Sequence, residues 1–167
     1  DIDQRPGRNE KTTIIMLDRI MKLPLPVENL IPHQKPMCLV DTLVEFKDQG
    51  GTVEARVLPG QVLVDKDGRL ETLAVAEMIA QAYAAVKGYD DRLTGRPVRQ
   101  GFLVGIRKIQ FYQTVLAGDH LQIHVITVGS IAGFAVVEGV VTRKSDIIAE
   151  GQIKLWVNED EPTGEEN

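Results

Sequence analysis

The sequence predicts an α+β fold in which an antiparallel sheet of about six strands wraps around one long apolar helix. Three features support this: an Ala-rich apolar run, short Val- and Ile-rich segments separated by turn-like residues, and the order in which these occur along the chain. Two strand segments precede the apolar run and four follow it. Such a sheet covers one side of the helix, so we expect a second copy to cover the other side, giving a homodimer or dimer-based oligomer.

The helix is predicted over residues 73–86, LAVAEMIAQAYAAV, because Ala favours helix and the run is long for a strand. A bilayer span needs about 20 apolar residues, and this run is shorter and carries an acid. Gly88 is predicted to end the helix. Because Glu77 and Gln81 are four residues apart, they share one helical face and can point into the same cavity.

The predicted strands begin with a hairpin formed by 37–46 and 51–58, joined by the turn-like KDQG. Four more strand segments follow, with short polar turns between them: 101–112, 120–128, 133–142 and 146–157. In the last of these, aliphatic residues alternate with Lys154 and Trp156. This period of two is typical of a strand with one face against a core.

A single domain is predicted for residues 12–157, with a flexible tail at 1–11 and an acidic flexible tail at 158–167. Residues 12–23 have the spacing of a short amphipathic helix and lack the features of an export signal. A net charge of −5 argues against nucleic acid as a partner. Cys38 is the single cysteine and lies in an apolar run, so we expect a buried thiol, no intrachain disulfide and a cytoplasmic protein without a membrane partner.

Metal-binding patterns are weak. His120 and His124 are four residues apart, but in a strand they stand roughly 13 Å from each other. The acidic segment 65–71, DKDGRLE, lacks the spacing of a calcium loop. We therefore expect no bound metal.

Three segments, taken in order, resemble the beta-hydroxyacyl-acyl carrier protein dehydratases. LIPHQKPMCLVD (30–41) resembles that family's N-terminal Leu-Pro-His-Arg-x-Pro segment, and AEMIAQA (76–82) resembles its helix motif. FLVGIRKIQFYQTVLAGDHLQI (102–123) resembles its strand-turn-strand segment, and the likeness extends over residues 26–157. It implies the hotdog fold and a dehydratase of fatty acid or polyene synthesis. The implied substrate is a 3-hydroxyacyl thioester on the phosphopantetheine of acyl carrier protein or CoA, with no bound cofactor.

The chain departs from this family at one catalytic position. The dehydratases carry a His fourteen residues before the helix Glu, and Leu63 stands there in this sequence. A divergent branch associated with aryl polyene pigment synthesis begins near a Pro-His-x-x-Pro-Met segment, to which PHQKPM (32–37) is similar. The resemblance thus implies Glu77 and His33 as catalytic residues. The residues implied to bind substrate are Gln81, Phe102 and Gly105.

Dehydration needs a base for the proton beside the carbonyl, an acid for the departing hydroxyl, and donors for the enolate-like oxygen. Burial raises the pKa of a carboxyl group, so we expect Glu77 to be protonated and act as the acid, with neutral His33 as the base. Gln81 is expected to hydrogen-bond Glu77 and fix its rotamer. The helix N-terminus and a backbone N–H within 101–105 are expected to polarise the thioester carbonyl.

Two other functions fit the same residues. A hotdog thioesterase uses a carboxylate on the central helix with water as the nucleophile and needs no His, so Leu63 favours it. A non-catalytic acyl-binding dimer would instead keep Glu77 as a paired core residue.

Overall fold

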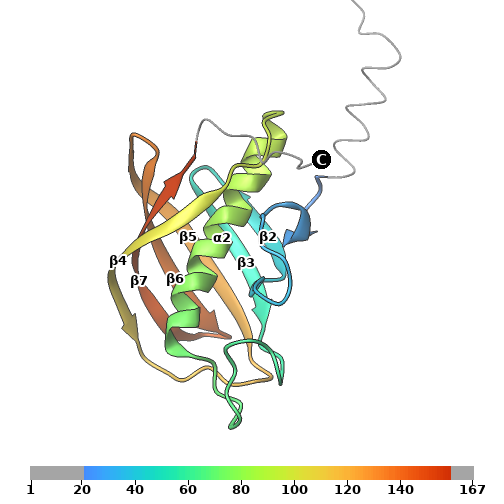
Figure 1. The fold of residues 1–167 in the computed structure, drawn as a ribbon, viewed down its shortest axis with the longest axis vertical. Helices are drawn as coiled ribbons and strands as arrows, with labels where there is room; N and C mark the ends of the chain where they lie inside the picture. The colour runs from blue at the N-terminus through green and yellow to red at the C-terminus, as the bar shows by residue number, and fades with distance from the viewer. Residues whose placement is uncertain (1–20, 159–167) are drawn as a thin grey trace, which may run out of the picture.

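The computed structural model describes residues 21–158. One helix, α2 (Thr72–Leu93), lies across one face of a curved, seven-stranded antiparallel sheet (Figure 1). The predicted α+β architecture is therefore confirmed. The tail predicted at 1–11, nearly all of the one at 158–167 and most of the helix predicted at 12–23 lie outside the described residues.

The sheet contains all six predicted strands and one more. In chain order the strands are β1 (Leu25–Pro26), β2 (Thr42–Lys47), β3 (Gly50–Arg56), β4 (Gly101–Phe111), β5 (His120–Ile131), β6 (Phe134–Arg143) and β7 (Asp146–Val157). Their order across the sheet is β1-β2-β3-β5-β6-β7-β4. The additional strand, β1, has two residues, too few to show a period of two in the sequence.

The helix extends beyond its predicted end. Gly88 lies inside α2, which continues to Leu93, so the prediction that Gly88 ends the helix is wrong. A Cβ at Gly88 would overlap the carbonyl oxygen of Leu30. Glycine is therefore needed there because another segment of backbone packs directly on the helix. No helix within residues 21–158 is long and apolar enough to cross a bilayer.

The core lies between α2 and the sheet. Inward-facing Leu121 and Ile123 of β5 are fully buried, and Gly139 of β6 leaves room for the side chain of Ile79. Cys38 is buried as predicted, and this burial raises the pKa of its thiol. The cysteine thus has the environment of a packing residue.

Strand β4 forms one edge of the sheet. It is 11 residues long and pairs with β7 alone among the described strands. Phe102, Val104 and Ile106 expose between 44% and 50% of their surface. A long edge strand with an apolar face is normally covered in a soluble protein.

Candidate active site

The segment that follows the 3₁₀ turn η1 (Val27–Asn29) runs along α2 and is fixed to it at both ends. Near the C-terminal end of the helix, the Arg92 guanidinium donates to the carbonyl of Asn29, and Leu30 packs on Gly88. Closer to the N-terminal end, the backbone N–H of Leu39 donates to the side chain of Gln81 over 2.7 Å. His33 lies on the stretch between these attachments.

Gln81 connects the segment to Glu77. Its side chain is fully buried. Its Nε2 donates to the carbonyl of Met37 over 2.8 Å and to Oε1 of Glu77 over 2.9 Å. The predicted hydrogen bond between Gln81 and Glu77 is therefore present, and the contacts to Met37 and Leu39 hold the amide in place.

Glu77 and His33 form a close pair. His33 Nε2 lies 3.4 Å from Oε1 of Glu77, and 29% of each side chain is exposed. His33 Nδ1 is enclosed and has no hydrogen-bond partner among the described residues. The two residues that the sequence marked as catalytic are thus brought together within one subunit.

The carboxyl group of Glu77 is ionised more readily than predicted. Burial raises its pKa, but the hydrogen bonds from His33 and Gln81 and the charge of His33 outweigh this, so the pKa lies below its ordinary value. The expectation that Glu77 is protonated near neutral pH is therefore wrong for this subunit. Both donors were identified from the sequence, but the sequence did not reveal that their combined effect on the pKa exceeds that of burial.

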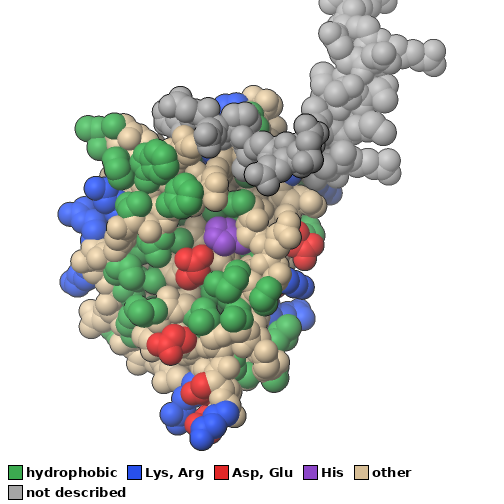
Figure 2. Space-filling model, in the orientation of Figure 1, with side chains coloured by type: hydrophobic (Ala, Val, Ile, Leu, Met, Phe, Trp, Pro, Cys, Tyr) green, Lys and Arg blue, Asp and Glu red, His purple; other side chains and the backbone are tan. Residues whose placement is uncertain are grey.

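A cavity of about 180 Å³ opens beside this pair. Gly101, Phe102 and Leu103 of β4 form its opposite wall, and the Phe102 ring stacks on Trp156 with centroids 5.9 Å apart. Figure 2 shows this face of the molecule, where a histidine and acidic side chains lie among hydrophobic ones over α2 and β4. The cavity combines an apolar surface with two titratable groups, which is typical of an enzyme site.

The structure separates some of the predicted site residues from the cavity. Gln81 is buried behind Glu77, and Gly105 lies at an irregularity of β4; neither lines the cavity. Leu63 adopts a positive φ of 66° in the loop before α2 and also does not line it. Of the three histidines, His33 alone lines the cavity.

Four polar residues of this cavity were not predicted from the sequence: Tyr83, Lys87, Asp91 and Arg99. A signal was present, because Ala80, Ala84, Lys87 and Asp91 follow Glu77 at steps of three and four residues, as one face of a helix requires. Arg99 comes from the loop before β4 and has no such signal.

The other two histidines are engaged elsewhere on the sheet. His120 Nε2 lies 3.3 Å from a carboxylate oxygen of Glu54. His124 Nδ1 lies 2.7 Å from the hydroxyl of Thr52. They face different partners on β3 and contribute nothing to the Glu77 cavity.

Comparisons with known proteins agree with this architecture. The model of the ApeP-like family, described as ApeP dehydratase, matches residues 25–164. A curated 3-hydroxyacyl-[acyl-carrier-protein] dehydratase FabZ from Oceanobacillus iheyensis is 27% identical over 144 residues, covering 72% of this chain and 92% of the relative. The FabZ of Acetivibrio thermocellus is 24% identical, covering 77% and 90%.

Among solved structures, the dehydratase heterocomplex ApeI:P from Xenorhabdus doucetiae matches with a TM-score of 0.76 and 21% identity, covering 81% of this chain and 93% of that one. The protein smu.793 from Streptococcus mutans, bound to acetyl CoA, matches with a TM-score of 0.51 and 17% identity, covering 70% and 86%. These likenesses show the fold, and the helix wrapped by a sheet is the hotdog arrangement that the resemblance implied.

Proposed function

The chain belongs to the ApeP-like dehydratase family, and we propose that it removes water from a 3-hydroxyacyl group carried as a thioester on the phosphopantetheine of acyl carrier protein or CoA. The observation that carries this proposal is the 3.4 Å approach of His33 Nε2 to Glu77 at a cavity with an apolar wall. This histidine supplies the second titratable group of the cavity. The sequence position that holds the usual histidine in the dehydratases is Leu63 here, and Leu63 does not line the cavity.

The reaction needs one proton to be taken and one to be given. The base accepts the proton from C2, the C2=C3 double bond forms, and the hydroxyl leaves C3 as water with a proton from the acid. The pair therefore begins and ends with one proton. Since the pKa of Glu77 is lowered, the reactive form has a Glu77 carboxylate as base and the proton on His33, the reverse of the roles expected from the sequence.

Two features support the placing of an acyl thioester in this cavity. Gln81 holds the Glu77 carboxylate by one oxygen, so the pair is oriented before substrate arrives. Phe102 and Leu103 offer apolar contact to the acyl group. We assign the backbone at Gly101–Leu103, which lines the same cavity, to polarise the thioester carbonyl.

We also propose that a second subunit covers the edge of β4. The exposed row Phe102, Val104 and Ile106 is apolar, and Phe102 belongs to both this edge and the cavity. A partner docked there would exclude water from the Glu77–His33 pair, which strengthens its electrostatic interactions. We assign a second copy of this chain as the partner, so the assay below uses the chain alone.

The test is turnover of 3-hydroxybutanoyl-carrier protein by the full chain, followed by mass spectrometry as loss of water. We expect enoyl product with wild type, and a fall in kcat of about 100-fold or more with Glu77→Gln and with His33→Gln. Glu138→Gln, on the exposed face of β6, is the matched control and should leave turnover unchanged. Absence of enoyl product with wild type, or undiminished product with Glu77→Gln, overturns the proposal.

The same assay separates the two rival functions. Release of free thiol from the acyl thioester, lost in Glu77→Ala and indifferent to His33→Ala, would identify a thioesterase. A wild-type protein that turns over no acyl thioester, together with a Glu77→Gln variant that is more stable than wild type, would identify a non-catalytic acyl-binding subunit.

A further inference from the structure

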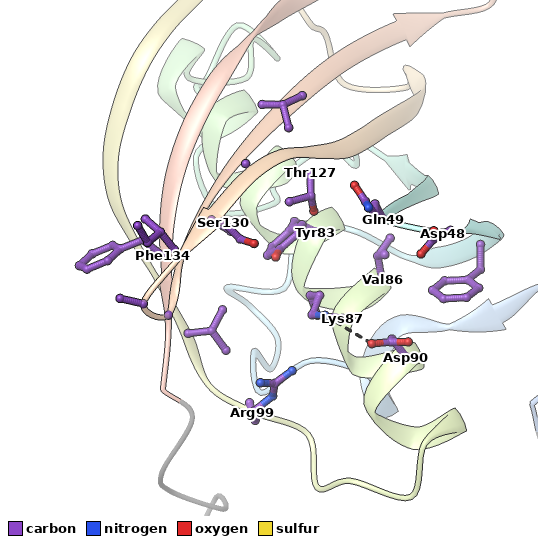
Figure 3. A pocket seen from close by; sticks show the side chains of 18 residues that line it. Asp48, Gln49, Tyr83, Val86, Lys87, Asp90, Arg99, Thr127, Ser130 and Phe134 are labelled. Atoms are coloured by element: carbon purple, nitrogen blue, oxygen red, sulfur yellow. Dashed lines mark hydrogen bonds and ion pairs between the residues drawn. The ribbon is translucent and has the colours of Figure 1, made fainter.

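A second, larger cavity lies further along α2 from the Glu77 site. Its volume is about 520 Å³, and it extends between the C-terminal half of the helix and the hairpin that joins β5 to β6 (Figure 3). Thr127 and Ser130 of β5 and Val86 of α2 are among its lining residues. A volume of about 300–1,000 Å³ is typical of small-molecule sites, whereas the Glu77 cavity alone is smaller than this.

The two cavities share one wall. Tyr83, Lys87, Arg99 and Val157 line both of them. Tyr83 is six residues beyond Glu77, which places it roughly 9 Å further along the helix axis. An elongated ligand that starts at Glu77 and follows the helix therefore meets this wall before it reaches the larger cavity.

Tyr83 is the fixed part of that wall. It is 6% exposed, and its side chain faces that of Thr127 in Figure 3. Burial raises the pKa of this phenol, so it remains a neutral hydrogen-bonding group. Lys87 Nζ lies 3.3 Å from Oδ2 of Asp90, three residues further along the helix.

We propose that Tyr83 sets the length of the acyl group accepted at the Glu77 site, because its ring separates the reaction cavity from the larger cavity beyond. This inference rests on the proposed function of the site. The chain selects acyl groups short enough to end before the ring. Removal of the ring joins the two cavities into one elongated site that admits longer chains.

The test measures binding and turnover separately. Butanoyl-, octanoyl- and dodecanoyl-pantetheine are titrated into the full chain by calorimetry, and the matching 3-hydroxyacyl thioesters are assayed for dehydration. Wild type should favour the butanoyl probe over the dodecanoyl probe by about tenfold or more. Tyr83→Ala should bind dodecanoyl-pantetheine about tenfold or more tightly than wild type, and Tyr83→Phe should behave as wild type.

Two further variants guard against a folding defect and against a general loosening of the site. Tyr83→Leu keeps apolar packing without the ring and should show the same shift if Tyr83→Ala fails to fold. Ser130→Trp, added to either variant, refills the larger cavity from its far side and should reverse the gain.

Unchanged length preference in both Tyr83→Ala and Tyr83→Leu overturns the inference, even if wild type dehydrates the short substrate. Absence of turnover with every substrate, by contrast, overturns the proposed function itself.

Discussion

Each half of α2 carries one acidic side chain next to the Glu77 cavity, and the two carboxylates differ in how fully they are buried and hydrogen-bonded. In the C-terminal half, Asp91 is 1% exposed and receives hydrogen bonds of 2.9 and 3.2 Å from Arg99, with Arg96 3.5 Å away. In the N-terminal half, Glu77 is 29% exposed and is approached by His33 and Gln81 through the same oxygen.

This difference distinguishes a structural charge from a reactive one. A buried carboxylate is tolerated in a fold when donors take up its lone pairs, as at Asp91, and breaking such a pair is costly because it leaves a buried charge uncompensated. Glu77 Oε1 accepts both contacts, and no described hydrogen bond involves Oε2, so one oxygen is left for a substrate. We therefore expect changes in the C-terminal half to affect mainly stability, and changes at Glu77 to affect mainly activity.

The largest effect is expected at Gly88. In Gly88→Ala the new Cβ overlaps the Leu30 carbonyl, so the free energy of unfolding should fall by about 3 kcal/mol or more, measured by urea denaturation. Ala favours helix over Gly by about 1 kcal/mol, so a loss cannot come from helix propensity. Gly129→Ala, where nothing lies within 4 Å of the new atom, is the control. Equal stability of the two variants would contradict the close packing of Leu30.

Asp91→Asn should follow, lowering the free energy of unfolding by about 3 kcal/mol because Arg99 loses its charged partner in a buried setting. Its neighbour Asp90 is 32% exposed, and Asp90→Asn should cost less than about 1 kcal/mol. Glu77→Gln should also cost less than about 1 kcal/mol while lowering kcat by about 100-fold or more. If Glu77→Gln proves as destabilising as Asp91→Asn, the contrast between the two halves of the helix fails.

The fold was predictable where local composition and turn residues mark the elements. The helix was predicted from its length and Ala content, and the six strands from Val- and Ile-rich segments between turn-like residues, with a period of two in the last strand; each is present in the structure. The end of α2 was wrong because Gly88 is explained by backbone from residue 30, which no local pattern reports. β1 was missed because its two residues are strand only through pairing with β2.

The residues of the candidate site were easier to predict than the direction of the Glu77 pKa shift. Glu77 and Gln81 followed from helical spacing, and His33 followed from a resemblance, since 44 positions separate it from Glu77 in the sequence. The direction of the Glu77 pKa shift depends on how the effect of burial compares with that of two donors, one of which, His33, comes from a distant segment. That balance is set by distances in the folded chain, which no sequence pattern reports. The role proposed for Tyr83 depends likewise on which cavities its ring separates.

Gln81 is expected to affect both stability and activity, because it is fully buried and also hydrogen-bonds Glu77. Gln81→Met keeps the volume and leaves Leu39 N–H and the Met37 carbonyl without partners, so the free energy of unfolding should fall by about 2 kcal/mol. Because Gln81 positions Glu77, the Gln81→Met substitution should lower kcat by a larger factor than it raises KM. Gln122→Met, on the exposed face of β5, should change neither. If Gln81→Met loses stability but keeps the wild-type kcat, Gln81 has only a structural role.

The smallest effect is the pH dependence of stability that Glu77 contributes. Its pKa in the folded subunit lies below the ordinary value of 4.5, so the unfolded chain binds more protons between the two values. The contribution is therefore complete above pH 4.5 and is lost as the pH falls through the folded pKa. Urea denaturation between about pH 6 and about pH 3.5 should show wild type losing more stability than Glu77→Gln, which has no proton to gain there. Glu138→Gln, treated identically, accounts for the general acid sensitivity of the fold. Parallel curves for wild type and Glu77→Gln would mean that the donors from His33 and Gln81 only balance the effect of burial. A wild type that loses less stability than Glu77→Gln as the pH falls would mean that burial dominates and raises the pKa, which is what the role of general acid requires.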